Sequence, residues 1–112
     1  MKRTFLGEFE ELVLLAVVIL EEDAYGVSVT RELEDKTGRT VGFSTVHSTL
    51  ERLEEKGYVS SCMGGATAER GGRRKRFFTA TAFGRKALRE VKQVRETMWN
   101  ALSPTSLQLM ES

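Results

Sequence analysis

The sequence predicts a mainly α domain, α+β by class, with three helices, one two-stranded β-hairpin and a long C-terminal helix. Three observations support this prediction. Apolar residues recur at helical spacing in four segments, the spacing changes to that of strands after Gly57, and a basic, glycine-rich stretch separates two strand-like segments. With 112 residues, 40% of them hydrophobic, the chain has the size and composition of one ordinary globular domain.

Residues 5–22 are predicted to form the first helix, because Phe9, Leu12, Val13 and Leu20 recur at helical spacing. Most of the positions between them are apolar as well. A helix that is apolar on nearly every side must be covered on nearly every side. In so small a chain, we expect a second subunit to supply part of that cover.

Two short helices joined by a tight connection follow the first helix. One is predicted over 27–36, and the next begins with Ser44 as its N-cap and ends at Gly57. This order is the helix-turn-helix pattern. The strand-like segments 58–63 and 74–79 come directly afterwards, so their hairpin would form a wing. We therefore expect a winged helix-turn-helix with a two-stranded β wing.

The last helix is predicted to begin after Thr81, which caps it, and to end near Leu102, because Pro104 disfavours helical geometry in the residue before it. The chain is expected to divide into a winged helix-turn-helix region, a C-terminal dimerisation helix of the same domain, and a flexible tail. These three regions span residues 1–80, 81–102 and 103–112.

Charge is distributed unevenly along the chain. Residues 1–66 hold 7 Lys and Arg against 12 Asp and Glu, whereas residues 67–112 hold 10 against 4. Such an asymmetry is typical of a surface that binds a polyanion. The wing would contact DNA phosphates and release their counterions, although a solvated loop is the plainer alternative. The basic residues predicted for this contact are Arg70, Arg73, Arg74, Lys75 and Arg76.

The third helix is predicted to read the DNA bases. In helix-turn-helix proteins, the N-terminal residues of the second helix of the motif reach base edges in the major groove. The first turns here present small hydrogen-bonding side chains, whereas glutamates further along would be repelled by DNA. We expect base contacts from Ser44, Thr45, His47 and Ser48, and phosphate contacts from Arg31 and Arg52. Ser44 and Thr45 can also cap the helix.

No enzymatic activity is expected, since no nucleophile–base pair, carboxylate pair or phosphate-binding loop is recognisable. The single cysteine, Cys62, and the single histidine, His47, are too few for a disulfide or a zinc site. We therefore expect no metal and no other cofactor. Cys62 is expected to pack within its strand rather than to sense redox state.

The longest apolar run, residues 12–20, has nine residues, whereas a membrane span needs about 20. The basic residues Lys2 and Arg3 are not followed by the apolar core and cleavage site of a signal peptide. We therefore expect a cytoplasmic protein with no membrane partner.

An apolar stripe on the last predicted helix is expected to join two copies of the chain. Trp99 lies one position off this stripe, beside Met98, and a lone Trp there usually buries its area in a core or a dimer seam. Alternatively, Trp99 forms the wall of a pocket for a flat aromatic molecule between two subunits. The residues predicted for this dimer or ligand interface are Phe9, Leu12, Val91, Val94, Met98, Trp99 and Leu102.

Three segments together resemble the PadR family of bacterial transcriptional regulators: 24–26 (AYG), 44–59 (STVHSTLERLEEKGYV) and 73–88 (RRKRFFTATAFGRKAL). The resemblance covers roughly residues 9–90. It implies a winged-helix DNA-binding domain whose C-terminal helix forms the dimer with help from the first helix. It also points to the short subgroup with a single C-terminal dimerisation helix. Members of the family are mostly repressors, and some are released by phenolic or other aromatic small molecules.

The chain departs from the family pattern at three positions. His47 stands where the family usually has tyrosine, Ser44 where it has glycine, and Phe78 where it favours tyrosine. Specific tyrosine contacts are therefore not carried over to this chain. The fold assignment stands, because Phe78 still fills an apolar place.

Together these observations predict a sequence-specific transcriptional regulator, a repressor, that binds a pseudo-palindromic operator in double-stranded DNA as a homodimer. One alternative is a sensor whose pocket for a small aromatic effector at the dimer interface is its main feature. Another is a winged-helix module that binds protein instead of DNA. Salt-dependent retention on DNA is expected of the transcriptional regulator and not of the protein-binding module, so it distinguishes the two.

Overall fold

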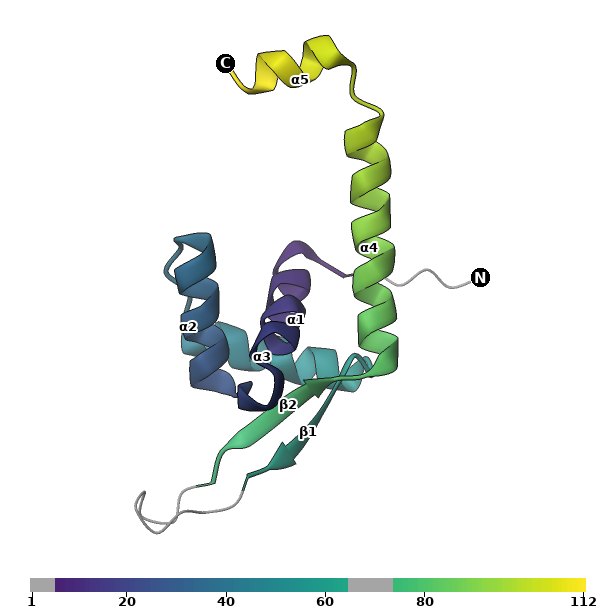
Figure 1. Ribbon diagram of the computed structural model, residues 1–112. Coiled ribbons are helices and arrows are strands. Elements are labelled where there is room, and N and C mark those ends of the chain that lie inside the picture. Colours follow the sequence, from purple (N-terminus) through teal and green to yellow (C-terminus); the bar gives the residue numbers. More distant parts are fainter. Residues whose placement is uncertain (1–5, 65–73) are drawn as a thin grey trace.

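The computed structural model describes residues 6–64 and 74–112 and confirms the winged helix-turn-helix prediction (Figure 1). Three helices form the body, a β-hairpin extends from it, and a long helix rises beside α1 and beyond it (Figure 1). In chain order the elements are α1 (Glu8–Leu20), the short 3-10 helix η1 (Glu21–Asp23), α2 (Gly26–Thr37), α3 (Phe43–Glu55), β1 (Val59–Met63), β2 (Arg76–Ala80), α4 (Ala82–Asn100) and α5 (Pro104–Met110).

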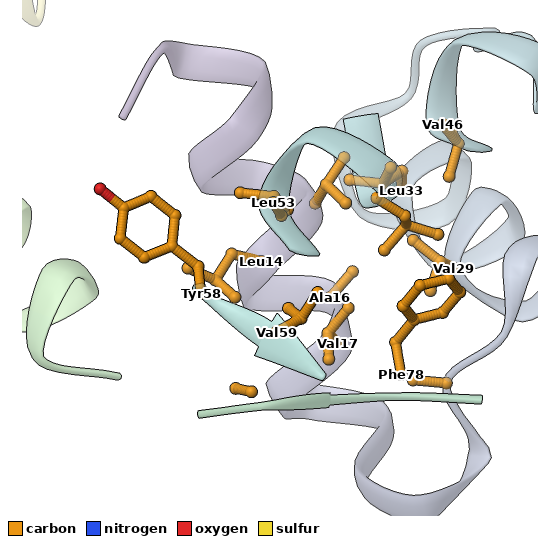
Figure 2. Packing of buried hydrophobic residues seen from close by; sticks show 14 of the residues in the cluster. Leu14, Ala16, Val17, Val29, Leu33, Val46, Leu53, Tyr58, Val59 and Phe78 are labelled. Atoms are coloured by element: carbon orange, nitrogen blue, oxygen red, sulfur yellow. The ribbon is translucent and has the colours of Figure 1, made fainter. Parts of the chain in front are cut away.

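The core lies between the three body helices and the hairpin (Figure 2). Branched aliphatic side chains from all three helices are fully buried there, and the ring of Phe78 from β2 closes the cluster. On α2, Val29 and Leu33 are buried in this core, whereas Val27 is exposed. On α3, Val46, Leu50 and Leu53 all face the core, so the opposite face of this helix is fixed toward solvent.

The connection between α2 and α3 differs in detail from the prediction. Gly38 ends α2 in the left-handed region at φ 69°, which suits glycine. The N-cap of α3 is Gly42 and not Ser44: Gly42 has extended backbone geometry, and its carbonyl accepts from the Val46 N–H at 3.1 Å. The sequence signal for a cap is a polar side chain, but here the backbone alone makes the start. Ser44 therefore lies inside the first turn, free of capping.

The hairpin is a two-stranded antiparallel sheet in which Val59 pairs with Ala80 and Met63 with Arg76. It is fastened to the start of α2, because the Phe78 N–H donates to the Ala24 carbonyl at 2.8 Å and Tyr25 forms a bridge with Phe77. The wing is thus held beside the helix-turn-helix from its base. The hairpin tip lies outside the described residues.

The junction between the wing and α4 depends on a close approach. Thr81 caps α4 as predicted, since its hydroxyl accepts from the Gly84 N–H at 3.0 Å. Gly84 lies against the backbone of Tyr58, where a Cβ atom would stand 2.1 Å from the carbonyl oxygen. A residue without a side chain is therefore required for α4 to leave the body at this point.

Two expectations for the remaining chain are corrected. Residues 103–112 were expected to be a loose tail, but Pro104–Met110 form helix α5 with Ser103 as N-cap. Proline ends the preceding helix and also suits the first position of a new one. Cys62 was expected to pack within its strand, but it is exposed on β1.

Candidate nucleic-acid interface

The four predicted base-reading residues lie on one surface of α3. Ser44, Thr45 and Ser48 are exposed, and His47 is partly exposed beside them. Because the opposite face of α3 is buried in the core, these side chains cannot turn inward. All four fall within the first two turns, where a recognition helix meets base edges. This set of residues is called the reading face below.

An aromatic residue that the sequence analysis did not single out belongs to the same surface. Phe43 is the first residue of α3, and it is 50% exposed. Its ring stacks on that of His47, with centroids 6.0 Å apart and an angle of 12° between the planes. Its other neighbour is Gly26, where a Cβ atom would stand 2.6 Å from the ring. The feature of the sequence that could have identified Phe43 is Gly26, because a residue without a side chain leaves room for a ring at the start of α2.

The base of the wing contributes basic residues beside the reading face. Lys75 holds its ammonium group 4.1 Å from the centroid of the Tyr25 ring, which places this cation near the start of α2. Arg74 is exposed next to it. Arg70 and Arg73, which the sequence also predicted for DNA contact, lie outside the described residues. Lys75 and Arg76 line the same hollow as Phe43 and His47, so these two basic side chains of the wing lie beside the start of α3.

Arg76 links the wing to α3. Its guanidinium donates to Glu54 Oε1 at 2.9 Å and to the Ser61 hydroxyl at 3.0 Å, and Ser61 donates to Glu54 Oε2 at 2.5 Å. The charge of Glu54, which would otherwise repel DNA, is thereby balanced. The same contacts hold the hairpin against α3.

The two remaining predicted phosphate contacts differ in their surroundings. Arg31 is exposed on α2. Arg52 lies on α3 near the carboxylate of Glu10, with its Nε 3.7 Å from Glu10 Oε2. The same carboxylate accepts from Lys56 Nζ at 2.7 Å and from the Gly7 N–H at 3.1 Å.

Glu10 is a nearly buried carboxylate, and its pKa is set by opposing effects. Burial alone would raise the pKa of Glu10, but the hydrogen bonds from Lys56 and Gly7 and the charges of Lys56 and Arg52 lower it below its ordinary value. The ionised form is therefore the one that the fold favours. It ties α1 to the C-terminal half of α3.

A small, mostly apolar hollow of about 180 Å³ opens beside the start of α3. Val27, Phe43 and His47 are among its lining residues, and Lys75 and Arg76 contribute from the wing. A larger hollow of about 390 Å³ lies between the end of α1, β2 and Arg85 at the start of α4, and no residue of α3 lines it.

The predicted interface residues of α4 divide into two groups. Val91 packs partly against the core of its own chain, as do Phe9 and Leu12 of α1. In contrast, Val94, Met98 and Trp99 are 64%, 68% and 54% exposed. Leu102, just after the helix, is half-buried. The far half of α4 thus presents an apolar face that nothing in the described part of this chain covers.

Within residues 6–64 and 74–112, no helix has the length and the apolar character that a membrane span requires. Nowhere among the same residues do three His, Cys, Asp or Glu side chains gather in a way that could hold a metal ion.

Known proteins that resemble this chain have the same winged-helix fold. The model of the transcriptional regulator PadR-like family matches residues 14–90. The crystal structure of a PadR family transcriptional regulator from Eggerthella lenta is 27% identical at a TM-score of 0.62, and the match covers 94% of this chain and 88% of that one. No curated protein matches significantly.

Two further solved structures show the same fold. A PadR-like regulator from Bacillus cereus is 20% identical at a TM-score of 0.66, with 93% of this chain and 92% of the other covered. A PadR family regulator from Clostridium difficile is 22% identical at a TM-score of 0.63, with 80% and 91% covered.

Proposed function

This chain belongs to the PadR-like family of transcriptional regulators, and from that premise we propose that it represses transcription as a homodimer bound to a pseudo-palindromic operator. Regulators of this family bind DNA and are not enzymes. The proposal concerns the form of the active species, the residues that contact DNA, and the sign of the regulation. Its place of action would be the cytoplasm.

One observation carries the proposal: the reading face is polar, exposed and flanked by the basic base of the wing. Serine and threonine hydroxyls can donate to or accept from bases and phosphates in the major groove. We assign base contacts to Ser44, Thr45, His47 and Ser48. Phosphate contacts would come from the wing and from two arginines of the helices, namely Arg70, Arg73, Arg74, Lys75 and Arg76 together with Arg31 and Arg52.

The homodimer would form through the exposed face of α4. Val94, Met98 and Trp99 leave an apolar surface on a helix that projects past the body (Figure 1). A two-fold partner would cover this surface with the same residues of its own chain. Such a dimer would place the two copies of α3 about 34 Å apart, one turn of B-DNA, and this spacing corresponds to a pseudo-palindromic site.

In this scheme the dimer represses transcription by occupying the operator. A dimer that inserts two helices into successive major grooves and lays two wings along the flanking backbone would occupy both sides of the operator. Polymerase could not use a promoter that overlaps that stretch of DNA. The DNA phosphates would supply much of the binding energy through counterion release, and the reading face would supply the selectivity.

A second candidate function is a response to a small aromatic effector. The observation in its favour is Trp99, whose indole is more than half exposed next to the exposed thioether side chain of Met98. Between two subunits these side chains would form an apolar wall suited to a flat ring. Titration with planar aromatic compounds should then quench the fluorescence of Trp99 and weaken DNA binding together. Quenching without any change in DNA affinity would argue against regulation through this site.

Selection of duplexes from a random pool tests the proposed function. The wild-type protein should enrich a two-fold symmetric sequence with half-sites about 10 base pairs apart. Thr45→Asp, in the first turn of α3, should abolish enrichment by repelling the DNA, although an acidic residue there suits the helix itself. Thr105→Asp, in the first turn of α5, is the matched control and should enrich the same sequence. Failure of the wild type to enrich any sequence would contradict the proposal.

A further inference from the structure

We propose that Phe43 is a specificity-determining residue whose ring contacts the 5-methyl group of a thymine in each operator half-site. This inference rests on the proposed function, because it assigns one base contact within that DNA complex. It adds an apolar contact to a reading face that otherwise offers hydrogen bonds. The sequence predicts a helix that begins with Ser44 as its N-cap, but in the structure Phe43 is the first residue of α3.

Phe43 stands at a position from which a recognition helix contacts DNA. Phe43 is the first residue of α3, directly before Ser44 and one turn before His47. This is the part of a recognition helix that enters the major groove. Half of the Phe43 side chain is exposed on the same surface as the exposed hydroxyls. A groove that receives Ser44 and Ser48 would therefore meet the ring as well.

The ring of Phe43 is held in place by its neighbours. On one side it stacks on His47, with the centroids 6.0 Å apart. On another side it fills the space that the absent side chain of Gly26 leaves, since a Cβ there would lie 2.6 Å from Cε2 and 3.0 Å from Cζ. The core behind is already closed by the fully buried side chains of Val46 and Phe78. A ring confined in this way loses little further freedom when it contacts a base.

The exposed ring of Phe43 is chemically complementary to the methyl group of thymine. Bases expose hydrogen-bonding groups along the major groove, and thymine adds an apolar one, the 5-methyl group, which Phe is known to contact. The hollow beside Phe43 is mostly apolar and has a volume of about 180 Å³. That volume is below the range of about 300–1,000 Å³ that drug-sized ligands occupy. It has room for the 5-methyl group of a thymine, and the ammonium group of Lys75 at its edge suits an adjacent phosphate.

The test removes the methyl group from the DNA and leaves the protein intact. Each thymine of the selected duplex is replaced by deoxyuridine, symmetrically in both half-sites, and the affinity is measured by fluorescence anisotropy. Loss of one buried methyl corresponds to about fourfold in affinity per half-site, hence about sixteenfold for the dimer. We expect one thymine position per half-site to show this loss with the wild-type protein.

Variants assign the effect to Phe43. Phe43→Ala should bind the thymine and deoxyuridine duplexes equally, and Phe43→Leu, which keeps an apolar side chain, should restore part of the difference. The matched control is Phe83→Ala: Phe83 is also in the first turn of a helix, is 49% exposed, and stacks on Tyr58 with centroids 5.0 Å apart. It should keep the full thymine preference, because Phe83 belongs to α4 and its ring stacks on Tyr58 rather than on His47.

The outcomes separate this inference from the function on which it rests. If the protein selects a duplex but every deoxyuridine substitution is neutral, or if Phe43→Ala keeps the thymine preference, the inference is overturned and DNA binding stands. A selected half-site without thymine overturns it as well. If no duplex is selected at all, the proposed function fails first and the inference fails with it.

Discussion

Replacing Gly84 by alanine tests the packing that joins the wing to α4. At an exposed position inside a helix, Gly→Ala usually stabilises a protein by about 1 kcal/mol. At Gly84 the new Cβ would stand 2.1 Å from the Tyr58 carbonyl oxygen, 3.0 Å from its carbonyl carbon and 3.2 Å from its Cα. All three are backbone atoms, so no side-chain rotation relieves the clash. The helix would have to move away from the hairpin.

The expected magnitude follows from these two opposing effects. Overpacking costs about 1–3 kcal/mol, and a backbone clash this short belongs at or above the upper end. After the gain in helix propensity, Gly84→Ala should lower the free energy of unfolding by about 2 kcal/mol. For a domain of this size, that corresponds to a fall in Tm of roughly 10 °C. The sign is therefore opposite to that of an ordinary helical Gly→Ala substitution.

Thermal unfolding followed by circular dichroism at 222 nm measures this effect. All variants are compared at one protein concentration, because the proposed dimer would unfold in a concentration-dependent way. Ala82→Gly is the matched control, since Ala82 is exposed in the same first turn of α4. It should cost up to about 1 kcal/mol from helix propensity. A Gly84→Ala variant as stable as the wild type would refute the close approach of α4 to Tyr58.

Three further predictions concern the dimer, the wing and the acidic network. Trp99→Ala should weaken dimerisation by about 5 kcal/mol, because each of the two subunits loses about 100 Å² of buried apolar surface at about 25 cal/mol per Å². Sedimentation across a concentration series measures this, and an unchanged dimer would count against the interface. Arg74→Ala should reduce the slope of log affinity against log salt concentration by about 0.9 per half-site, whereas Lys92→Ala, at an exposed position on α4, should leave it unchanged. If Arg74→Ala has the same slope as the wild type, Arg74 is not one of the phosphate contacts. Because the pKa of Glu10 is lowered in the folded protein, its ionised carboxylate stabilises the fold fully above the unfolded-state pKa of 4.5, and this effect disappears as the pH falls through the folded-state pKa. Glu10→Gln should therefore flatten the fall of Tm with acid, and parallel curves of Tm against pH for the two proteins would contradict this.

The order of elements could be predicted from the sequence because its signals are local. The change from helical to strand spacing at Gly57 is visible in a few residues, and so is the cap at Thr81. Local signals failed where one residue type serves two purposes. Pro104 was interpreted as the end of a helix, but it also starts α5, and Gly42 caps α3 without the polar side chain that marks most caps.

Features of the candidate site that depend on distant residues could not be predicted. Phe43 lies beside the reading face because Gly26, seventeen positions earlier, leaves room for its ring. Arg76 meets Glu54 only through the pairing of β1 with β2 and their position against α3. In both cases a basic or aromatic residue is obvious in the sequence, but its partner is set by tertiary packing. The exposed face of α4 follows from where that helix leaves the body.

Fluorescence anisotropy with the selected duplex, a scrambled duplex and two salt concentrations tests the central claim most directly. The account predicts tighter binding to the selected duplex, two chains per site, and an affinity that falls steeply as salt rises, as expected when several phosphates are contacted. Equal binding of both duplexes, or binding that salt does not change, would contradict a sequence-specific dimer that reads DNA with α3 and holds it with the wing.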